Sequence, residues 1–163
     1  MFVIEDLTMK RIGKVKTGYD ELLTYLRSLP FEKDVSRYVS QRQVCWLKWK
    51  VNLGSGKVSK GVEVTDKFQE FGDRVLPGWD IGLVTVGNGI AAHRDHSYGD
   101  REAVVVNVVG ECEFQCGDEK LKLENGEIVK FNCKQIHSVK ADSDRRISVV
   151  FWKWSRKYKG LVQ

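Results

Sequence analysis

The sequence predicts a mostly β protein with N-terminal helices, in which two β-sheets pack face to face as a barrel or jelly roll. Short runs rich in valine, isoleucine and aromatic residues follow one another through the second half of the chain. Two of these runs, 103–109 (AVVVNVV) and 146–152 (RISVVFW), are apolar on both faces, which indicates strands covered on both sides. Two helical patterns precede them and are available to cover one sheet.

The helical patterns lie in the N-terminal half. In 17–30, leucines repeat at helical spacing until a proline ends the run, and Thr17 is the expected N-cap. In 64–77, apolar residues again share one face before a second proline, although Gly72 weakens the pattern. A first strand is expected between the two helices, at 43–49 (QVCWLKW).

The remaining strands are expected after the second helix. They are 80–86, 103–109, 111–116, 120–123, 127–131, 136–140 and 146–152. Asn125-Gly126 separates 120–123 from 127–131, and this dipeptide is typical of a tight type I′ hairpin. The sequence therefore predicts a hairpin at that point.

A chain of 163 residues favours one domain, 1–163. Within it we expect a supporting region over about 1–79, a jelly-roll core over about 80–153 and a basic tail over 154–163. No apolar stretch approaches the roughly 20 residues that span a bilayer, and the acidic N-terminus is not a secretory signal. We therefore expect a cytoplasmic protein with no membrane partner.

The net charge and the cysteines exclude few classes of function. The net charge is +5, with Lys153, Arg156, Lys157 and Lys159 near the C-terminus, which is compatible with a nucleic acid partner. Solvated lysines alone would give the same count. The four cysteines include no CxxC pair, so we expect reduced packing residues rather than a thiolate metal site.

Chemistry is indicated by the stretch HRDH at 93–96. In an extended segment His93 and Asp95 point to the same side, whereas His96 points away and is expected at a rim or on the surface. The third histidine of the chain is His137. Two imidazoles and one carboxylate on one octahedral face leave three positions open, as in non-haem iron(II) oxygenases. The sequence thus predicts an iron(II) site of His93, Asp95 and His137, against the plainer interpretation of a polar surface loop.

A second group of polar residues opens the last strand. Alternation places Arg146 and Ser148 on one face and Arg145 on the other, where we expect it to be solvated. An arginine buried in a barrel is costly unless it meets an anion. The far carboxylate of a dicarboxylate would serve, bound by the Arg146 guanidinium with the Ser148 hydroxyl as a second donor.

Together, HRD at 93–95, His137 and RIS at 146–148 resemble the HxD…H…RxS signature of iron(II)- and 2-oxoglutarate-dependent oxygenases. The resemblance runs from about Phe68 to Trp152, and its layout is most similar to AlkB-like members, with prolyl-hydroxylase-like members next. It implies a double-stranded β-helix (jelly-roll) core, bound Fe(II), 2-oxoglutarate as co-substrate and O2 as oxidant.

The sequence departs from the AlkB-like pattern at one point. Those members usually carry an Asn-x-Tyr pair on the strand before HxD, which helps to hold 2-oxoglutarate, but here that stretch reads LVTVGNG. Thr85, Asn88 and Asn107 are the candidates to supply the contacts beyond Arg146 and Ser148.

The resemblance implies a dioxygenase that hydroxylates or oxidatively demethylates its substrate. The basic chain favours a nucleic acid base, on which Trp46 or Trp49 would stack unless they pack in the core. A prolyl residue of a protein or a small molecule is the alternative substrate. Two competing functions are a metal-binding cupin, which would bind metal without 2-oxoglutarate turnover, and a basic binding module, which would bind no metal.

Overall fold

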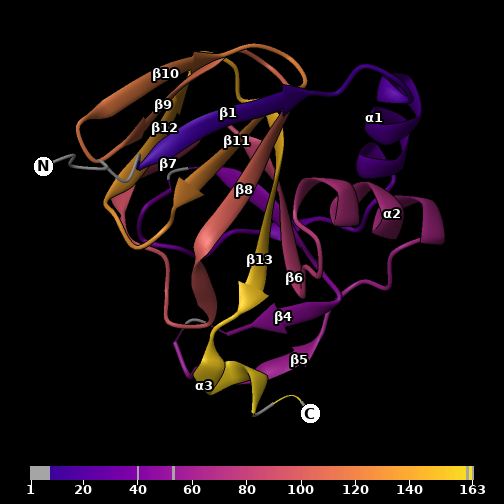
Figure 1. The fold of residues 1–163 in the computed structure, drawn as a ribbon, viewed down its shortest axis with the longest axis vertical. Coiled ribbons are helices and arrows are strands. Elements are labelled where there is room, and N and C mark those ends of the chain that lie inside the picture. The colour runs from indigo at the N-terminus through magenta and orange to yellow at the C-terminus, as the bar shows by residue number, and fades with distance from the viewer. Residues whose placement is uncertain (1–7, 40, 53, 161, 163) are drawn as a thin grey trace, which may run out of the picture.

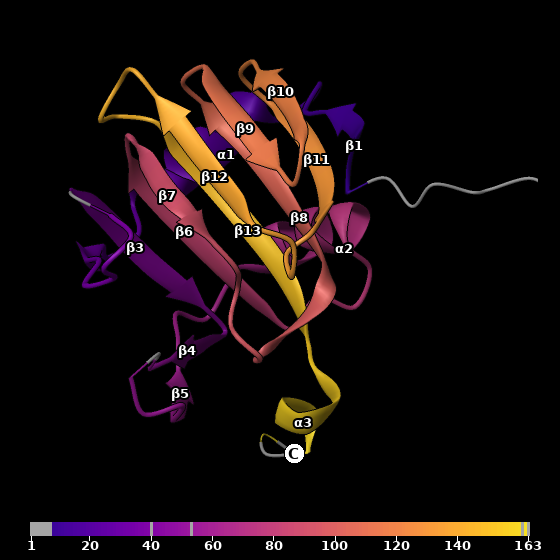
Figure 2. The ribbon, with the colours of Figure 1, turned by 90° about the vertical axis from the view of Figure 1, so that its left-hand side faces the viewer.

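Two antiparallel sheets face each other in the computed structural model, which describes residues 8–39, 41–52, 54–160 and 162 (Figures 1 and 2). The larger sheet has the order β1 (Met9–Lys14), β11 (Glu127–Asn132), β8 (Gly99–Val109), β13 (Ile147–Trp154), β6 (Ile81–Gly87), β3 (Arg42–Leu47), β2 (Glu32–Lys33). The smaller sheet has the order β10 (Glu119–Leu123), β9 (Cys112–Cys116), β12 (His137–Ala141), β7 (Gly89–His93). This arrangement is the predicted double-stranded β-helix, or jelly roll.

The central strands β8 and β13 of the larger sheet are apolar on both faces because each face packs against a different layer. In β8, Ala103 and Val105 lie in the core between the sheets, whereas Val104, Val106 and Val108 pack toward the helices. The same alternation in β13 sends Ile147, Val149 and Phe151 to the helices and Trp152 and Trp154 between the sheets. The inward face of β13 therefore points toward the interior of the barrel.

The outer face of the larger sheet is covered by α1 (Tyr19–Arg27) and α2 (Asp66–Val75), which lie together on one side of the molecule (Figure 1). The predicted cap of the first helix is wrong. The N-cap is Gly18, in the left-handed region at φ 71°, and no side chain caps the helix. The N-cap of the second helix is Thr65, whose side chain accepts a hydrogen bond from the backbone N–H of Phe68.

The helix α2 continues through Gly72, and this glycine packs directly against a tryptophan. A Cβ at Gly72 would lie 2.2 Å from Nε1 of Trp79, which is buried. The glycine thus allows close packing of the Trp79 indole against the helix, and this contact offsets its low helix propensity.

The predicted hairpin at Asn125-Gly126 is wrong. A turn is present there, but β10 pairs with β9 while β11 pairs with β8 and β1. The two strands belong to different sheets, so the turn is a corner between the sheets. The expected strand 43–49 is also divided, because Lys48 adopts φ 67° and ends β3.

Several elements are not predicted by the sequence. They are β1, β2, β7, the ribbon of β4 (Trp49–Val51) and β5 (Val58–Lys60), and α3 (Arg156–Lys159). The ribbon and α3 lie together at the end of the molecule opposite β10 (Figures 1 and 2). All four cysteines are free and buried, as expected of packing residues. Among the described residues, no helix combines the length and the apolar character that a membrane crossing requires.

Candidate metal centre and anion pocket

The pairing of β7 with β12 brings two histidines together. His93, the last residue of β7, is the register partner of His137, the first residue of β12. Cross-strand partners have Cβ atoms only about 5 Å apart, so their side chains meet. The glycine-rich turn before β7 makes this pairing possible, since a Cβ at Gly89 (φ 130°) would lie 2.1 Å from the carbonyl oxygen of Val139 on β12.

Asp95 completes a cluster of three potential ligands. Its Oδ1 lies 3.0 Å from Nε2 of His137 and 3.3 Å from Nε2 of His93. Ligands bound about 2.1 Å from one ion at adjacent corners of an octahedron stand about 3 Å apart. The spacing and the types of donor therefore fit one metal ion, as the sequence predicts for these three residues.

Backbone carbonyls orient both imidazoles. Nδ1 of His93 donates to the carbonyl of Ala91, and Nδ1 of His137 donates to the carbonyl of Gln135, each at 2.8 Å. The proton on Nδ1 leaves the lone pair on Nε2 in the neutral ring, and Nε2 is the atom that faces Asp95. A histidine that binds a metal through Nε2 needs this arrangement.

The electrostatics of the cluster favour an ionised carboxylate. Burial alone would raise the pKa of Asp95, but hydrogen bonds and charge interactions with His137 and His93 outweigh it and hold that pKa well below its usual range. Burial lowers the pKa of His137, yet the adjacent carboxylate reverses this, and the net direction is upward. Asp95 thus carries a negative charge in a place where a cation would be stabilised.

Two further contacts fix Asp95. Its backbone N–H donates to the carbonyl of Cys133 at 3.0 Å, and its Oδ2 accepts a hydrogen bond from Nε1 of Trp152 at 2.9 Å. One carboxylate oxygen therefore faces the histidines, and the other faces the indole.

Arg146 lies in the same cavity as the three ligands and is buried, with 3% of its surface exposed. Its Nε donates to Oδ1 of Asn107 at 2.7 Å, while Nη2 has no hydrogen-bond partner among the described residues. Burial lowers the pKa of Arg146, and the nearby Cys112 thiol offsets this only in part. A buried guanidinium with an unsatisfied N–H is a site that an anion would complete.

The hydroxyl groups expected near this arginine are present. Ser148 and Thr85 are both buried, line the cavity and are hydrogen-bonded to each other at 2.8 Å. One proton of the pair is left to donate to a ligand. Arg145, by contrast, is exposed. Arg146 is therefore buried and Arg145 is exposed, as the alternation along the strand predicts.

Neither of the two asparagines expected as co-substrate contacts lines the cavity. Asn88 is exposed on the turn between β6 and β7 and does not line the cavity. Asn107 is fully buried, and its amide nitrogen donates to the carbonyls of Gly110 at 2.8 Å and Glu124 at 3.1 Å. These bonds aim its oxygen at Arg146, so Asn107 orients the guanidinium.

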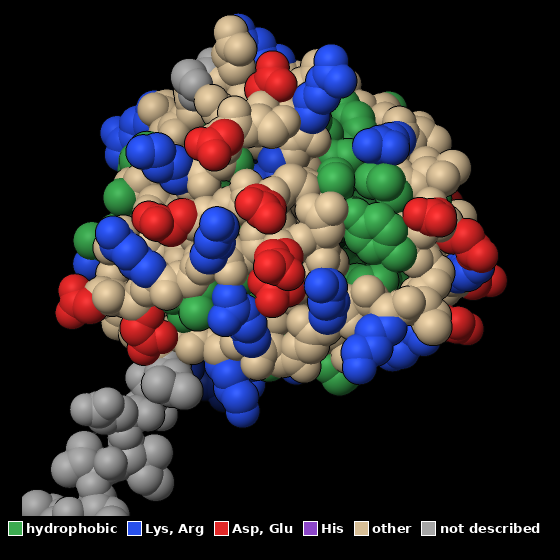
Figure 3. Space-filling view, turned by 90° about the horizontal axis from the view of Figure 1, so that it is seen from above, with side chains coloured by type: hydrophobic (Ala, Val, Ile, Leu, Met, Phe, Trp, Pro, Cys, Tyr) green, Lys and Arg blue, Asp and Glu red, His purple; other side chains and the backbone are tan. Residues whose placement is uncertain are grey.

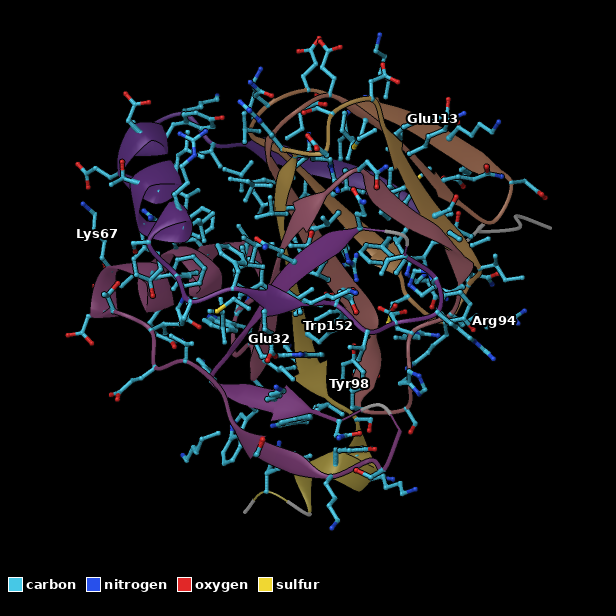
Figure 4. The ribbon with its side chains drawn as sticks, turned by 180° about the vertical axis from the view of Figure 1, so that it is seen from behind. Glu32, Lys67, Arg94, Tyr98, Glu113 and Trp152 are labelled. Atoms are coloured by element: carbon cyan, nitrogen blue, oxygen red, sulfur yellow. The ribbon has the colours of Figure 1, made fainter. Side chains whose placement is uncertain are left out.

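The cavity that contains these groups has a volume of about 920 Å³. Trp46, Tyr98 and Trp152 form an aromatic wall, in which Tyr98 lies edge-on to both indoles at 6.1 and 5.5 Å between ring centroids. Trp152 and Tyr98 lie close together inside the molecule, whereas Arg94 points outward (Figure 4). His96, expected at a rim, is exposed beside this cavity.

Comparison with known proteins identifies the class of fold. No protein-family model matches the chain, and no curated protein sequence matches it. Three of the solved structures that share its architecture illustrate the fold. They are OsALKBH1 (12% identity, covering 89% of this chain and 99% of that chain, TM-score 0.65), a prolyl-4-hydroxylase from Pseudomonas putida (12%, 91% and 93%, 0.60) and a 2OG-Fe(II) oxygenase family protein from Burkholderia pseudomallei (13%, 84% and 78%, 0.59).

At these identities the likeness is one of fold. The chain has the jelly-roll fold of 2-oxoglutarate and iron(II) oxygenases, and the AlkB-like and prolyl-hydroxylase-like layout predicted from its sequence is confirmed at that level.

Two contributors to the site escape prediction from the sequence. The composition of β13 suggests only a packing role for Trp152, although alternation along the strand places it on the same inward face as Ser148. The aromatic wall also includes Tyr98, which follows the HRDH stretch by two residues. Strand alternation could have shown that Trp152 faces the interior of the barrel. Its contact with Asp95 could not have been predicted, because it joins residues 57 positions apart and depends on the fold.

Proposed function

We propose that this chain is an Fe(II)- and 2-oxoglutarate-dependent dioxygenase, with residues 1–163 forming one oxygenase domain. One observation carries the proposal. A cavity that contains two imidazoles and a carboxylate around one point also contains a buried guanidinium, one N–H group of which has no partner in the described part of the chain. A metal-binding cupin would have no use for Arg146, so this pairing favours the oxygenase.

In the proposed reaction, His93, Asp95 and His137 hold the iron, and Arg146 binds the far carboxylate of 2-oxoglutarate with help from the Ser148 and Thr85 hydroxyls. When bound, iron supplies the oxidative chemistry that couples decarboxylation of 2-oxoglutarate to hydroxylation of a C–H bond. The protein contributes orientation. Hydrogen bonds from Nδ1 to backbone carbonyls hold the two imidazoles, and the Asn107 side chain holds the Arg146 guanidinium.

For the organic substrate we propose a nucleic acid base, which would be hydroxylated or oxidatively demethylated. The aromatic wall of Trp46, Tyr98 and Trp152 offers a surface on which a planar base can stack. Basic side chains around the cavity, from Lys33, Arg37 and Arg94, are suited to phosphate groups, whereas the Lys50 ammonium is paired with Glu32 at 2.7 Å. Trp49 does not line this cavity; the Lys60 ammonium lies over its ring.

Charge elsewhere on the surface is less informative. Seen from above, Lys and Arg side chains are interspersed with Asp and Glu side chains, beside a strip of hydrophobic ones (Figure 3). The features that favour a nucleic acid are therefore the residues around the cavity and the basic C-terminal segment.

The test is formation of succinate from 2-oxoglutarate by the Fe(II)-loaded protein, measured by mass spectrometry with panels of methylated oligonucleotides and proline-containing peptides. We expect succinate, increased by an oligonucleotide and absent from the Asp95→Ala variant. Metal binding without succinate under any condition would favour the cupin, and absence of metal binding would favour a binding module. A response to peptides alone would move the substrate to protein.

A further inference from the structure

The carboxylate of Asp95 has different partners on its two oxygens. Oδ1 lies within 3.0 and 3.3 Å of the histidine Nε2 atoms, whereas Oδ2 accepts the indole N–H of Trp152 at 2.9 Å. Trp152 comes from β13 in the larger sheet, and the histidines come from β7 and β12 in the smaller sheet. The contact therefore ties the metal cluster to the opposite layer of the barrel.

We propose that Trp152 is a positioning residue of the metal centre, which holds Oδ2 of Asp95 so that only Oδ1 is offered to the ion. The inference rests on the proposed function, because it requires the triad to bind a metal. Three single-atom ligands leave three octahedral positions free. A carboxylate bound through both oxygens would take one of these positions and leave too few for a chelating co-substrate and dioxygen.

The donor is neutral, and this matters for the charge at the site. An ammonium or guanidinium in its place would orient the carboxylate but would also compensate its charge. The indole supplies a single N–H without a charge. Asp95 therefore keeps its full negative charge for the cation.

The position of the indole is itself fixed by its neighbours. Trp152 is 3% exposed and lies edge-on to Tyr98, with 5.5 Å between ring centroids and 80° between planes. On its other border is Gly99, where a Cβ would lie 2.8 Å from Cδ1 of the ring. The absence of a side chain at residue 99 thus allows the ring orientation from which Nε1 reaches Asp95.

The test uses Co(II) as a redox-stable probe ion, added to the metal-free protein without 2-oxoglutarate, with affinity measured by calorimetry. Trp152→Phe removes the N–H and keeps an aromatic ring, while Gly99→Ala keeps the indole and displaces it. Loss of an outer hydrogen-bond partner typically costs 10–100-fold in metal affinity, and we expect a rise of about this size in the Kd for Co(II) in both variants.

The matched control is Trp154→Phe. Trp154 lies on the same face of β13 and is also buried, but it stacks on Tyr158 at 5.9 Å instead of contacting Asp95. The Trp154→Phe variant should bind Co(II) with the same Kd as the unmodified protein. Thermal unfolding of each metal-free variant checks the fold, and Gly99→Ala decides the matter if Trp152→Phe does not fold.

A purely structural role would lower the unfolding temperature of Trp152→Phe and leave its Kd for Co(II) unchanged, which would overturn the inference. Asp95→Ala separates this result from failure of the proposed function. If Asp95→Ala abolishes Co(II) binding while the Trp152 and Gly99 variants bind normally, only the role of Trp152 is wrong. If Asp95→Ala binds Co(II) normally, the metal site itself is wrong.

Discussion

Replacement of Arg146 by alanine should weaken 2-oxoglutarate binding without loss of the metal. Arg146 is buried, its Nε is held by Asn107, and its Nη2 has no partner among the described residues. Truncating one partner of a buried, hydrogen-bonded charge pair costs about 2–5 kcal/mol. At about 1.4 kcal/mol per factor of ten, we expect the Kd for 2-oxoglutarate to rise roughly 30- to 4,000-fold.

The assay is calorimetric titration of the Co(II)-loaded protein with 2-oxoglutarate, because cobalt holds the co-substrate without turnover. Arg145→Ala is the matched control, since its guanidinium is exposed one position earlier and its removal should change the Kd little. Arg146→Lys should give an intermediate Kd, because an ammonium keeps the charge and loses the planar fork. If Arg145→Ala weakens binding and Arg146→Ala does not, the assignment of the anion site is refuted.

Three further predictions concern packing, thiol chemistry and partner binding. Gly72→Ala should destabilise the fold by about 1–3 kcal/mol, because the new Cβ overlaps Trp79; chemical denaturation measures this, and an unchanged midpoint, as expected for the exposed control Glu70→Ala, would contradict it. All four cysteines are buried, and burial raises the pKa of the Cys133 thiol to about 12, so Ellman's reagent at pH 8 should label them only after unfolding; rapid labelling of the native protein would disprove this. Binding of a single-stranded oligonucleotide should weaken steeply with salt, and no binding at low salt would remove nucleic acid from the proposal.

The strands that form the barrel can be predicted because their signal is local. Runs such as 103–109 are apolar on both faces, and the larger sheet does have a layer on each side. The short edge strands cannot be predicted, because β1 is largely exposed and exists by pairing with β11, more than 100 residues away. The Asn125-Gly126 turn wrongly predicts a hairpin for the same reason, since the choice of partner strand is not local.

In the candidate site, too, features that depend on local strand geometry can be predicted from the sequence, and features that depend on long-range contacts cannot. Strand geometry alone places His93 with Asp95, and Arg146 with Ser148, on the same side of an extended chain. The sequence is therefore sufficient to suggest these two pairs. The roles of Asn107 and Trp152 depend on contacts across 39 and 57 residues of chain. Those contacts are set by which strands meet in the barrel, and no spacing in the sequence encodes them.

The central claim is that His93, Asp95 and His137 bind one metal ion. It is tested most directly by titrating the metal-free protein with Fe(II) under anaerobic conditions and counting bound ions by native mass spectrometry. We predict one ion per chain, and none in each single alanine variant of the triad, with circular dichroism confirming that each variant retains its fold. A folded Asp95→Ala or His137→Ala protein that still binds one ion with unchanged affinity would contradict the account.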